Sequence, residues 1–518
     1  MSRRSGAARE ARREERRERA ESRRRRRERE WSQPKPLRLP PWRRPADRPG
    51  HQASTAHVQS AFPAVAEAGL GARGVYVGRD HHGGSFVYDP WVLYTQGLLN
   101  DANTIVIGAL GWGKSALSKT YAWRQCVFGR IFENIDPKSE YGPLVEAMGG
   151  TVVRLAPGGR TRLNPLTRIG HRAMRERLLE AVTRAMLDRP LTQAEHVGLA
   201  AALRAADDHA DHAEVTIPAV LEQLATPSVE LARELMVSRN QAQDDLRECA
   251  LALRRLCQGP LAGMFDGPTT AGEATWDAPA VSLDLSAVGA GSTGADLALG
   301  ITMVCATTFL DAKREQRKHA LESAGRPAPK VIRTNDEAWR ALPIAGLGEY
   351  YQSAFKLARQ TGVQHWLVLH RFSDLQAAGD EGSRRQRLAE GLLSDASTTI
   401  IYHQHAKEAA VTAELAGLSS TEAQLIKGLH RGEALWRVGS RSFLVQHVMS
   451  ELERVLVATD AAMLELDPQH EPELVSQYAA LAAAGEGPGV VSPAGDVIQP
   501  ALPGFAAALA EKSGGEEP

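Results

Sequence analysis

The chain has 518 residues, of which 43% are apolar and 24% charged, and its 62 basic side chains balance 62 acidic ones. This composition is typical of a folded globular protein and excludes a collagen-like, fibrous or wholly disordered chain. The longest apolar stretch, residues 297–310, lies between two aspartates and contains a glycine. We therefore expect a core helix there and no integral membrane segment. Four cysteines without metal-type or redox-type spacing favour a cytoplasmic protein.

The neutral net charge hides a strongly basic beginning of the chain. Residues 1–50 contain 19 Arg or Lys against 8 acids, together with six prolines, and the remainder holds 43 basic and 54 acidic residues. With few apolar side chains, residues 1–50 are predicted to be a basic, Arg/Pro-rich disordered tail. Such a tail could bind DNA phosphates or an anionic membrane, or it could stay solvated without a fixed partner.

The rest of the chain has the pattern of an α/β protein. Residues 51–102 are predicted to be a short strand-rich segment with a hairpin near 74–89. Residues 103–166 alternate apolar strands with helical stretches, which is typical of parallel βαβ units, and strand patterns return within 270–453. Between them, residues 167–269 are rich in Ala, Leu, Arg and Glu and predict a helical insertion. Residues 454–518 are expected to form C-terminal helices and a flexible tail.

The most specific motif is the octapeptide GALGWGKS at residues 108–115, which matches the phosphate-binding pattern G-x-x-x-x-G-K-[ST] between an apolar strand and a helix. In such a loop, glycines let consecutive amides face a phosphate at a helix N-terminus. The lysine reaches the β- and γ-phosphates, and the serine hydroxyl suits Mg²⁺. We expect nucleotide-binding residues at Gly108, Gly111, Trp112, Gly113, Lys114, Ser115 and Ala116, with Ser115 as a metal ligand.

An acidic pair follows the predicted strand at residues 330–335. Asp336 is the expected second Mg²⁺ ligand, and Glu337 is the expected catalytic group that orients the attacking water. Arg333, Thr334 and Asn335 make this strand less apolar than usual, so an exposed acidic turn is the alternative. The sequence lacks a guanine-reading [NT]-K-x-D motif, which favours ATP over GTP.

Taken in order, the motifs resemble those of the VirB-type conjugative-transfer ATPases of type IV secretion systems, within the HerA/FtsK superfamily of P-loop ATPases. The resemblance covers about residues 74–453. It implies a RecA-like motor core with a mainly parallel sheet, a homo-hexameric ring, and ATP hydrolysis with Mg²⁺. The motifs that carry it are 108–115, DPKSEY at 136–141, LNPL at 163–166, GMFDGP at 263–268, DEAW at 336–339, ARQTG at 358–362 and SDL at 373–375.

The resemblance also assigns two further site residues. His370 stands where the family usually has a glutamine that senses the γ-phosphate, and it could donate a similar hydrogen bond. Arg359 matches the family position of an arginine that acts on the neighbouring subunit, with Arg371 as the competitor. The large N-terminal docking domain of the family is reduced here to about 100 residues, so the basic tail is the candidate replacement.

The function expected from these features is that of an ATP-hydrolysing motor of a conjugative transfer or type IV secretion apparatus. One alternative is a DNA-pumping translocase or coupling protein of the same superfamily. Another is a scaffold that nucleotide orders without hydrolysis. The expected partners are a membrane-associated transfer complex and, through the basic tail, DNA. The expected location is the cytoplasm, and the alternative is peripheral attachment to the inner face of the cell membrane.

Overall fold

A computed structural model describes residues 69–167, 172–209, 214–288, 294–342, 344–372, 387, 390–457, 490–491 and 497–498. The chain divides into two units, residues 1–66 and 67–518, and all described residues belong to the second. The predicted basic tail, the start of the segment 51–102, the motif at 373–375 and most of the predicted C-terminal tail lie outside the described residues.

The described part of the chain is built on an eleven-stranded sheet with the order β2-β1-β11-β10-β9-β3-β8-β7-β4-β6-β5. The seven strands from β9 to β5 are parallel, and the other four are antiparallel. The strands are β1 (Val75–Asp80), β2 (Ser85–Tyr88), β3 (Thr104–Ile107), β4 (Ile131–Asp136), β5 (Thr151–Arg154), β6 (Ala280–Asp284), β7 (Val331–Asn335), β8 (Val363–Leu369), β9 (Thr398–Ile401), β10 (Glu433–Val438) and β11 (Arg441–His447).

The predicted mainly parallel α/β fold is confirmed, with one addition. The β10–β11 hairpin was not predicted, and it changes the place of the N-terminal hairpin. Strand β1 pairs with β11, so the predicted hairpin β1–β2 extends the same sheet instead of standing apart from it. A two-stranded pair of β12 (Val490–Val491) and β13 (Val497–Ile498) is separate from this sheet.

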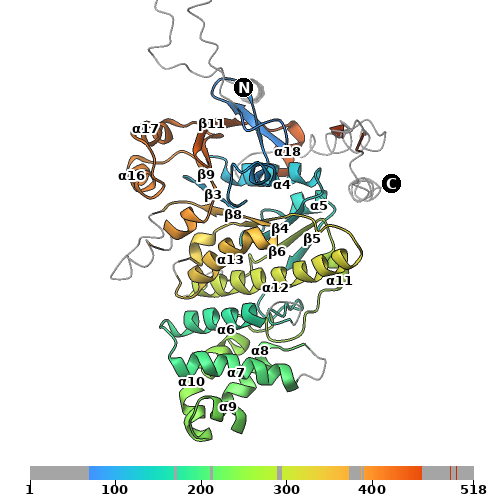
Figure 1. Ribbon diagram of the computed structural model, residues 1–518, viewed down its shortest axis with the longest axis vertical. Coiled ribbons are helices and arrows are strands. Elements are labelled where there is room, and N and C mark those ends of the chain that lie inside the picture. Colours follow the sequence, from blue (N-terminus) through green and yellow to red (C-terminus); the bar gives the residue numbers. More distant parts are fainter. Residues whose placement is uncertain are drawn as a thin grey trace, which may run out of the picture. The chain divides into compact units, whose positions relative to one another are not determined.

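Helices cover both faces of the sheet (Figure 1). Because successive strand residues point to opposite faces, Val106 of β3 packs in one apolar cluster, whereas Ile105 and Ile107 pack in the other. The Val106 cluster includes α4 (Lys114–Cys126) and α5 (Gly142–Ala147), and the second includes α12 (Ala295–Ser323) and α13 (Leu347–Thr361). Smaller elements are α3 (Pro90–Thr95), α11 (Glu273–Trp276), η2 (Ala338–Arg340), α16 (Ala406–Leu415), α17 (Ser420–Gly428) and α18 (Glu451–Val457).

Helix α12 contains the predicted core stretch 297–310. Among the described residues it is the one helix whose length and composition would allow a membrane crossing, but 72% of its apolar window is buried inside the protein. Its side chains join the apolar cluster that also contains β3, β6 and α13. This burial agrees with the prediction of a core helix.

Of the helices between β5 and β6, all except α11 lie within the predicted insertion 167–269. They share the second apolar cluster with the sheet, and α6 contacts both α12 and α13. The insertion therefore packs on the face of the core that α12 and α13 cover (Figure 1). Its helices are α6 (Arg172–Leu187), α7 (Gln193–His209), α8 (Ile217–Ala225), α9 (Val229–Glu234) and α10 (Arg239–Gln258).

Candidate nucleotide-binding site

The loop 108–113 connects the fully buried strand β3 to the first residue of α4. Gly111 and Gly113 have φ values of 77° and 107°, in the left-handed region that favours glycine. Gly113 is the N-cap of α4 and has no side chain to satisfy the first amides of the helix. A loop of this shape directs backbone N–H groups and the positive end of a 13-residue helix toward one point, which is the arrangement that binds phosphate.

The loop is anchored on residues that directly follow β9 and on one that directly precedes β10. The Ala109 amide donates to the His403 carbonyl at 3.0 Å, and the Gly432 amide donates to the Trp112 carbonyl at 3.1 Å. The Trp112 indole stacks on the His403 ring, with centroids 4.0 Å apart and planes 18° apart. A Cβ at Gly108 would lie 2.4 Å from Cβ of Tyr402, so this close approach requires glycine. Trp112 thus helps to fix the loop, beside its predicted part in nucleotide binding.

Lys114 is buried, and its ammonium donates to the carbonyl oxygens of Gly108 and Ala109 at 2.5 and 2.9 Å. Burial lowers the pKa of Lys114 to about 8, while the charge of Asp336 acts in the opposite direction. The ammonium therefore lies inside the curve of the loop, close to the acidic pair. Ser115 and Ala116, which follow in the first turn of α4, are partly exposed.

The acidic pair ends a strand that is buried along its whole length. Asp336 and Glu337 are both buried, and Asp336 Oδ1 accepts the Glu337 amide at 3.0 Å. Glu337 has a φ of 56°, a left-handed conformation that is costly for a residue other than glycine. Burial, followed by the charge of Glu337, raises the pKa of Asp336 to about 6. The exposed acidic turn considered above is excluded by this burial.

Glu337 is held by groups from two other loops. His370 Nε2 lies 2.9 Å from Glu337 Oε1, and the Lys138 ammonium forms an ion pair with the same oxygen. Burial acts to raise the pKa of Glu337, but the hydrogen bonds from His370 and Lys138 outweigh it and hold the pKa at about 2. Glu337 is therefore a carboxylate at neutral pH.

Strand order explains why these groups meet. Strands β3, β8, β7 and β4 are consecutive parallel neighbours, so their carboxyl ends lie along one edge of the sheet. Lys114 follows β3, His370 follows β8 and the acidic pair follows β7. The predicted residues of these three loops are thus brought to one edge.

Lys138 follows β4 at the same edge and was not among the predicted site residues. It belongs to the DPKSEY segment, whose Asp136, Glu140 and Tyr141 carried the sequence resemblance. The sequence did contain a usable indication, because a lysine two residues after the end of a parallel strand must lie near the ends of the neighbouring strands. Which strand is the neighbour of β4 becomes known only from the sheet order.

The structure does not bring Arg359 to the phosphate-binding loop of its own chain. Arg359 is exposed on the last turn of α13, just before β8 begins, and so lies toward the amino ends of the strands. Arg371 is also exposed but directly follows His370 after the carboxyl end of β8. A role for either arginine on a neighbouring subunit stays a prediction.

The residues present suit Mg²⁺ bound together with phosphate. Burial raises the pKa of Asp336 to about 6, and a nearby divalent cation would stabilise the ionised form of this carboxylate. The Ser115 hydroxyl is a hard oxygen donor of the kind that Mg²⁺ prefers. Within the described ranges, no group of three His, Cys, Asp or Glu could hold a metal ion. Few protein ligands are expected where phosphate oxygens and water complete the shell.

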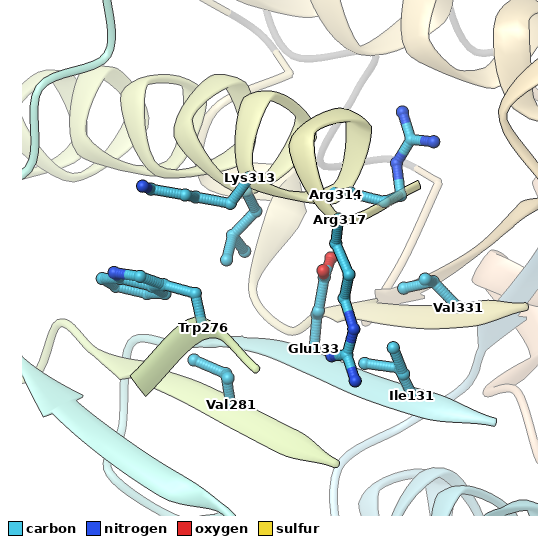
Figure 2. Close-up of a pocket in the computed structure, with 9 residues that line it drawn as sticks. Ile131, Glu133, Trp276, Val281, Lys313, Arg314, Arg317 and Val331 are labelled. Carbon is cyan, nitrogen blue, oxygen red and sulfur yellow. The ribbon is translucent and has the colours of Figure 1, made fainter. Parts of the chain in front are cut away.

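A separate small pocket lies at the opposite edge of the sheet (Figure 2). Ile131 and Val331 are the first residues of β4 and β7, and both line it. Three basic side chains from α12, Lys313, Arg314 and Arg317, form another part of its wall. Because the phosphate-binding loop is at the carboxyl ends of the strands, this pocket is not part of the candidate site.

A glycine-rich loop between a buried parallel strand and a helix, with an acidic pair after a strand two positions away, defines the P-loop NTPase fold. The solved structure of VirB4 of Thermoanaerobacter pseudethanolicus has this fold in common with the chain. Its TM-score is 0.59 at 21% sequence identity, and the match covers 75% of this chain and 100% of that chain.

More distant matches are to the plasmid coupling protein TrwB. Its complex with a non-hydrolysable ATP analogue gives a TM-score of 0.49 at 13% identity and covers 77% of this chain and 93% of that chain. Its complex with ADP and Mg²⁺ gives 0.45 at 13% identity and covers 68% and 86%. No protein-family model and no curated protein matches the sequence. Of the structures named here, the VirB4 structure has a TM-score high enough to show a shared fold.

Proposed function

We propose that this chain is an ATP-hydrolysing motor of a conjugative transfer or type IV secretion apparatus. The observation that carries the proposal is the convergence of Lys114 with Asp336 and Glu337 at one edge of the sheet. This convergence occurs within a fold that spans the whole chain of the VirB4 structure. Glu337, which is strained, buried and ionised, lies beside Asp336, the proposed Mg²⁺ ligand. Such a carboxylate is expected in a hydrolytic site, whereas a scaffold that only binds nucleotide does not need it.

In the proposed mechanism, the chain positions reactants and neutralises charge without covalent catalysis. Amides of the loop 108–113 and the Lys114 ammonium bind the β- and γ-phosphates of ATP. Ser115 and Asp336 would hold Mg²⁺, which would supply charge neutralisation at the phosphate oxygens. Glu337 accepts a hydrogen bond from the attacking water. His370, which contacts Glu337 Oε1, is the proposed sensor of the γ-phosphate.

ATP turnover by the Lys114→Ala variant tests this site. Loss of the ammonium should reduce turnover by at least about 100-fold, because the charge that stabilises the transferred phosphoryl group is removed. Lys318→Ala is the matched control, since Lys318 is a partly exposed lysine of α12 that pairs with Glu315 of the same helix. Equal turnover in the parent chain and the Lys114 variant would exclude the proposed site.

The proposal includes a homo-hexameric ring in which an arginine of one subunit completes the site of the next. Mixing two inactive variants tests this arrangement. Lys114→Ala removes the phosphate-binding side of an interface and Arg359→Ala removes the other, so mixed rings regain some intact interfaces and some turnover. If Arg371 is the acting residue, Arg359→Ala will be active by itself, and Arg371→Ala will be the inactive variant that regains turnover when it is mixed with Lys114→Ala. No recovery in either mixture would contradict action between subunits.

Two variants of the proposed motor differ in whether it transports DNA. A DNA-pumping translocase requires DNA-stimulated ATP turnover that falls steeply with salt, because phosphate contacts release counterions. A motor that assembles or energises a transfer complex at the membrane does not require it. Comparing the full chain with a chain that lacks residues 1–50, on DNA and on anionic vesicles, shows which surface the basic tail binds. Equal binding by both chains would exclude a role for the tail.

A further inference from the structure

Glu337 lies between two groups that come from the two neighbouring strands. Lys138, on the loop after β4, forms an ion pair with Glu337 Oε1, and His370, after β8, contacts the same oxygen. Strands β4 and β8 are the direct neighbours of β7. The Glu337 carboxylate, which is proposed to orient water, is therefore already paired with the Lys138 ammonium.

The backbone that carries Lys138 is fixed by its own loop. Asp136 accepts the amides of Lys138 and Tyr141 at 3.2 and 2.9 Å, and the Ser139 hydroxyl donates to Asp284 at 3.0 Å. Tyr141 is fully buried in the cluster that includes α4. By contrast, the Lys138 side chain is 42% exposed, whereas that of Glu337 is 6% exposed. Lys138 is thus the partner whose side chain can move while its backbone stays in place.

Phosphate is a stronger competitor for this ammonium than a single carboxylate. Lys138 and Glu337 both act electrostatically on Lys114, so the pair lies beside the position expected for the terminal phosphates. A γ-phosphate carries more negative charge and more acceptor oxygens than Glu337 offers. A lysine on a long flexible side chain with three donors can change partners there.

We propose that Lys138 exchanges partners during the ATP cycle: it pairs with Glu337 when the site holds no γ-phosphate, and it binds the γ-phosphate of ATP when ATP is present. The exchange releases Glu337 to orient the attacking water. ADP leaves the Lys138–Glu337 pair intact, so ATP and ADP are distinguished by this one side chain. This inference rests on the proposed ATPase site and adds a γ-phosphate-binding residue to it.

The experiment measures binding of ATPγS and ADP, each with Mg²⁺, to the full-length chain. Lys138→Met should weaken ATPγS binding by about tenfold or more and leave ADP binding within about twofold, because a charge-assisted hydrogen bond is lost only to the γ-phosphate. Lys138→Arg keeps the charge and should restore most of the difference. Lys318→Met is the control for loss of another partly exposed lysine.

A double-mutant cycle separates partner exchange from simple charge effects. Glu337→Gln frees Lys138 and should tighten ATPγS binding in the parent chain, but much less in the Lys138→Met chain. An ATPγS-to-ADP ratio that Lys138→Met does not change, or an effect of Glu337→Gln that is equal in both chains, overturns the inference. Two other results would overturn the proposed function as well. One is a parent chain that binds neither ATPγS nor ADP, and the other is a Lys114→Ala chain that binds both nucleotides as tightly as the parent chain does.

Discussion

Arg333, a residue of the strand β7 that the acidic pair follows, lies at the centre of a buried ionic cluster. Its side chain is fully buried and donates to Glu133 Oε2 at 2.8 and 2.6 Å and to Asp311 Oδ1 at 2.6 Å. Arg314 lies 3.9 Å from the same Asp311 oxygen and compensates it only in part. Replacing Arg333 by Met therefore leaves Glu133 buried without its cation.

Removal of one member of a buried ion pair typically costs about 3–5 kcal/mol, because the remaining charge loses its compensation. We expect Arg333→Met to lower the free energy of unfolding by that amount. Arg172→Ala, which breaks a surface pair with Glu176 across one helical turn, should cost at most about 0.5 kcal/mol.

Urea unfolding at pH 7 gives the free energy of unfolding of both variants. The urea concentration at the midpoint should fall, while the dependence of that free energy on urea concentration stays unchanged. Neutralising the two acids together with the arginine, as Glu133→Gln, Asp311→Asn and Arg333→Met, should recover most of the loss because no uncompensated charge then remains. A cost below about 1 kcal/mol for Arg333→Met alone, or no recovery in the triple variant, would refute this reasoning.

Two further perturbations address the loop and the pH response. Gly108→Ala should cost about 1–3 kcal/mol and abolish ATPγS binding, because its Cβ would lie 2.4 Å from that of Tyr402, whereas Gly142→Ala meets nothing within 4 Å and should leave binding intact. Burial lowers the pKa of His365 to about 3, so stability is complete above its unfolded pKa near 6.5 and falls as the pH drops toward 3. Between pH 7 and 5 this histidine accounts for a loss of about 2 kcal/mol, which His365→Gln should remove and substitution of the exposed His319 should not. Identical unfolding curves for these two histidine variants at both pH values would contradict that assignment.

Periodicity and motif spacing were sufficient to predict the parallel core. Strand β3 is a short apolar run followed by glycines and a helix, so its type and its loop could both be predicted from local residues. Strand β7 was harder to predict because Arg333, Thr334 and Asn335 are polar. All of them are buried in the structure, and Arg333 is accommodated because acids from β4 and α12 meet it there. Such long-range pairing leaves no local pattern.

The unpredicted parts of the site depend on contacts between distant segments. The acids Asp336 and Glu337 were predicted from their position after a strand, but the Lys138 partner depends on β4 being next to β7. The support of the phosphate-binding loop by Tyr402, His403 and Gly432 depends likewise on β9 pairing with β3. Residues 402–432 contain no phosphate-binding motif, so the sequence does not indicate this contact.

The nucleotide that remains bound after one turnover tests most directly whether Lys114 and Glu337 serve one hydrolytic site. The chain is mixed with a substoichiometric amount of ATP and Mg²⁺, and the bound nucleotide is identified after acid quench. The parent chain should hold ADP, Glu337→Gln should retain intact ATP, and Lys114→Ala should retain little of either. Conversion of bound ATP to ADP by Glu337→Gln at the parental rate would contradict the account.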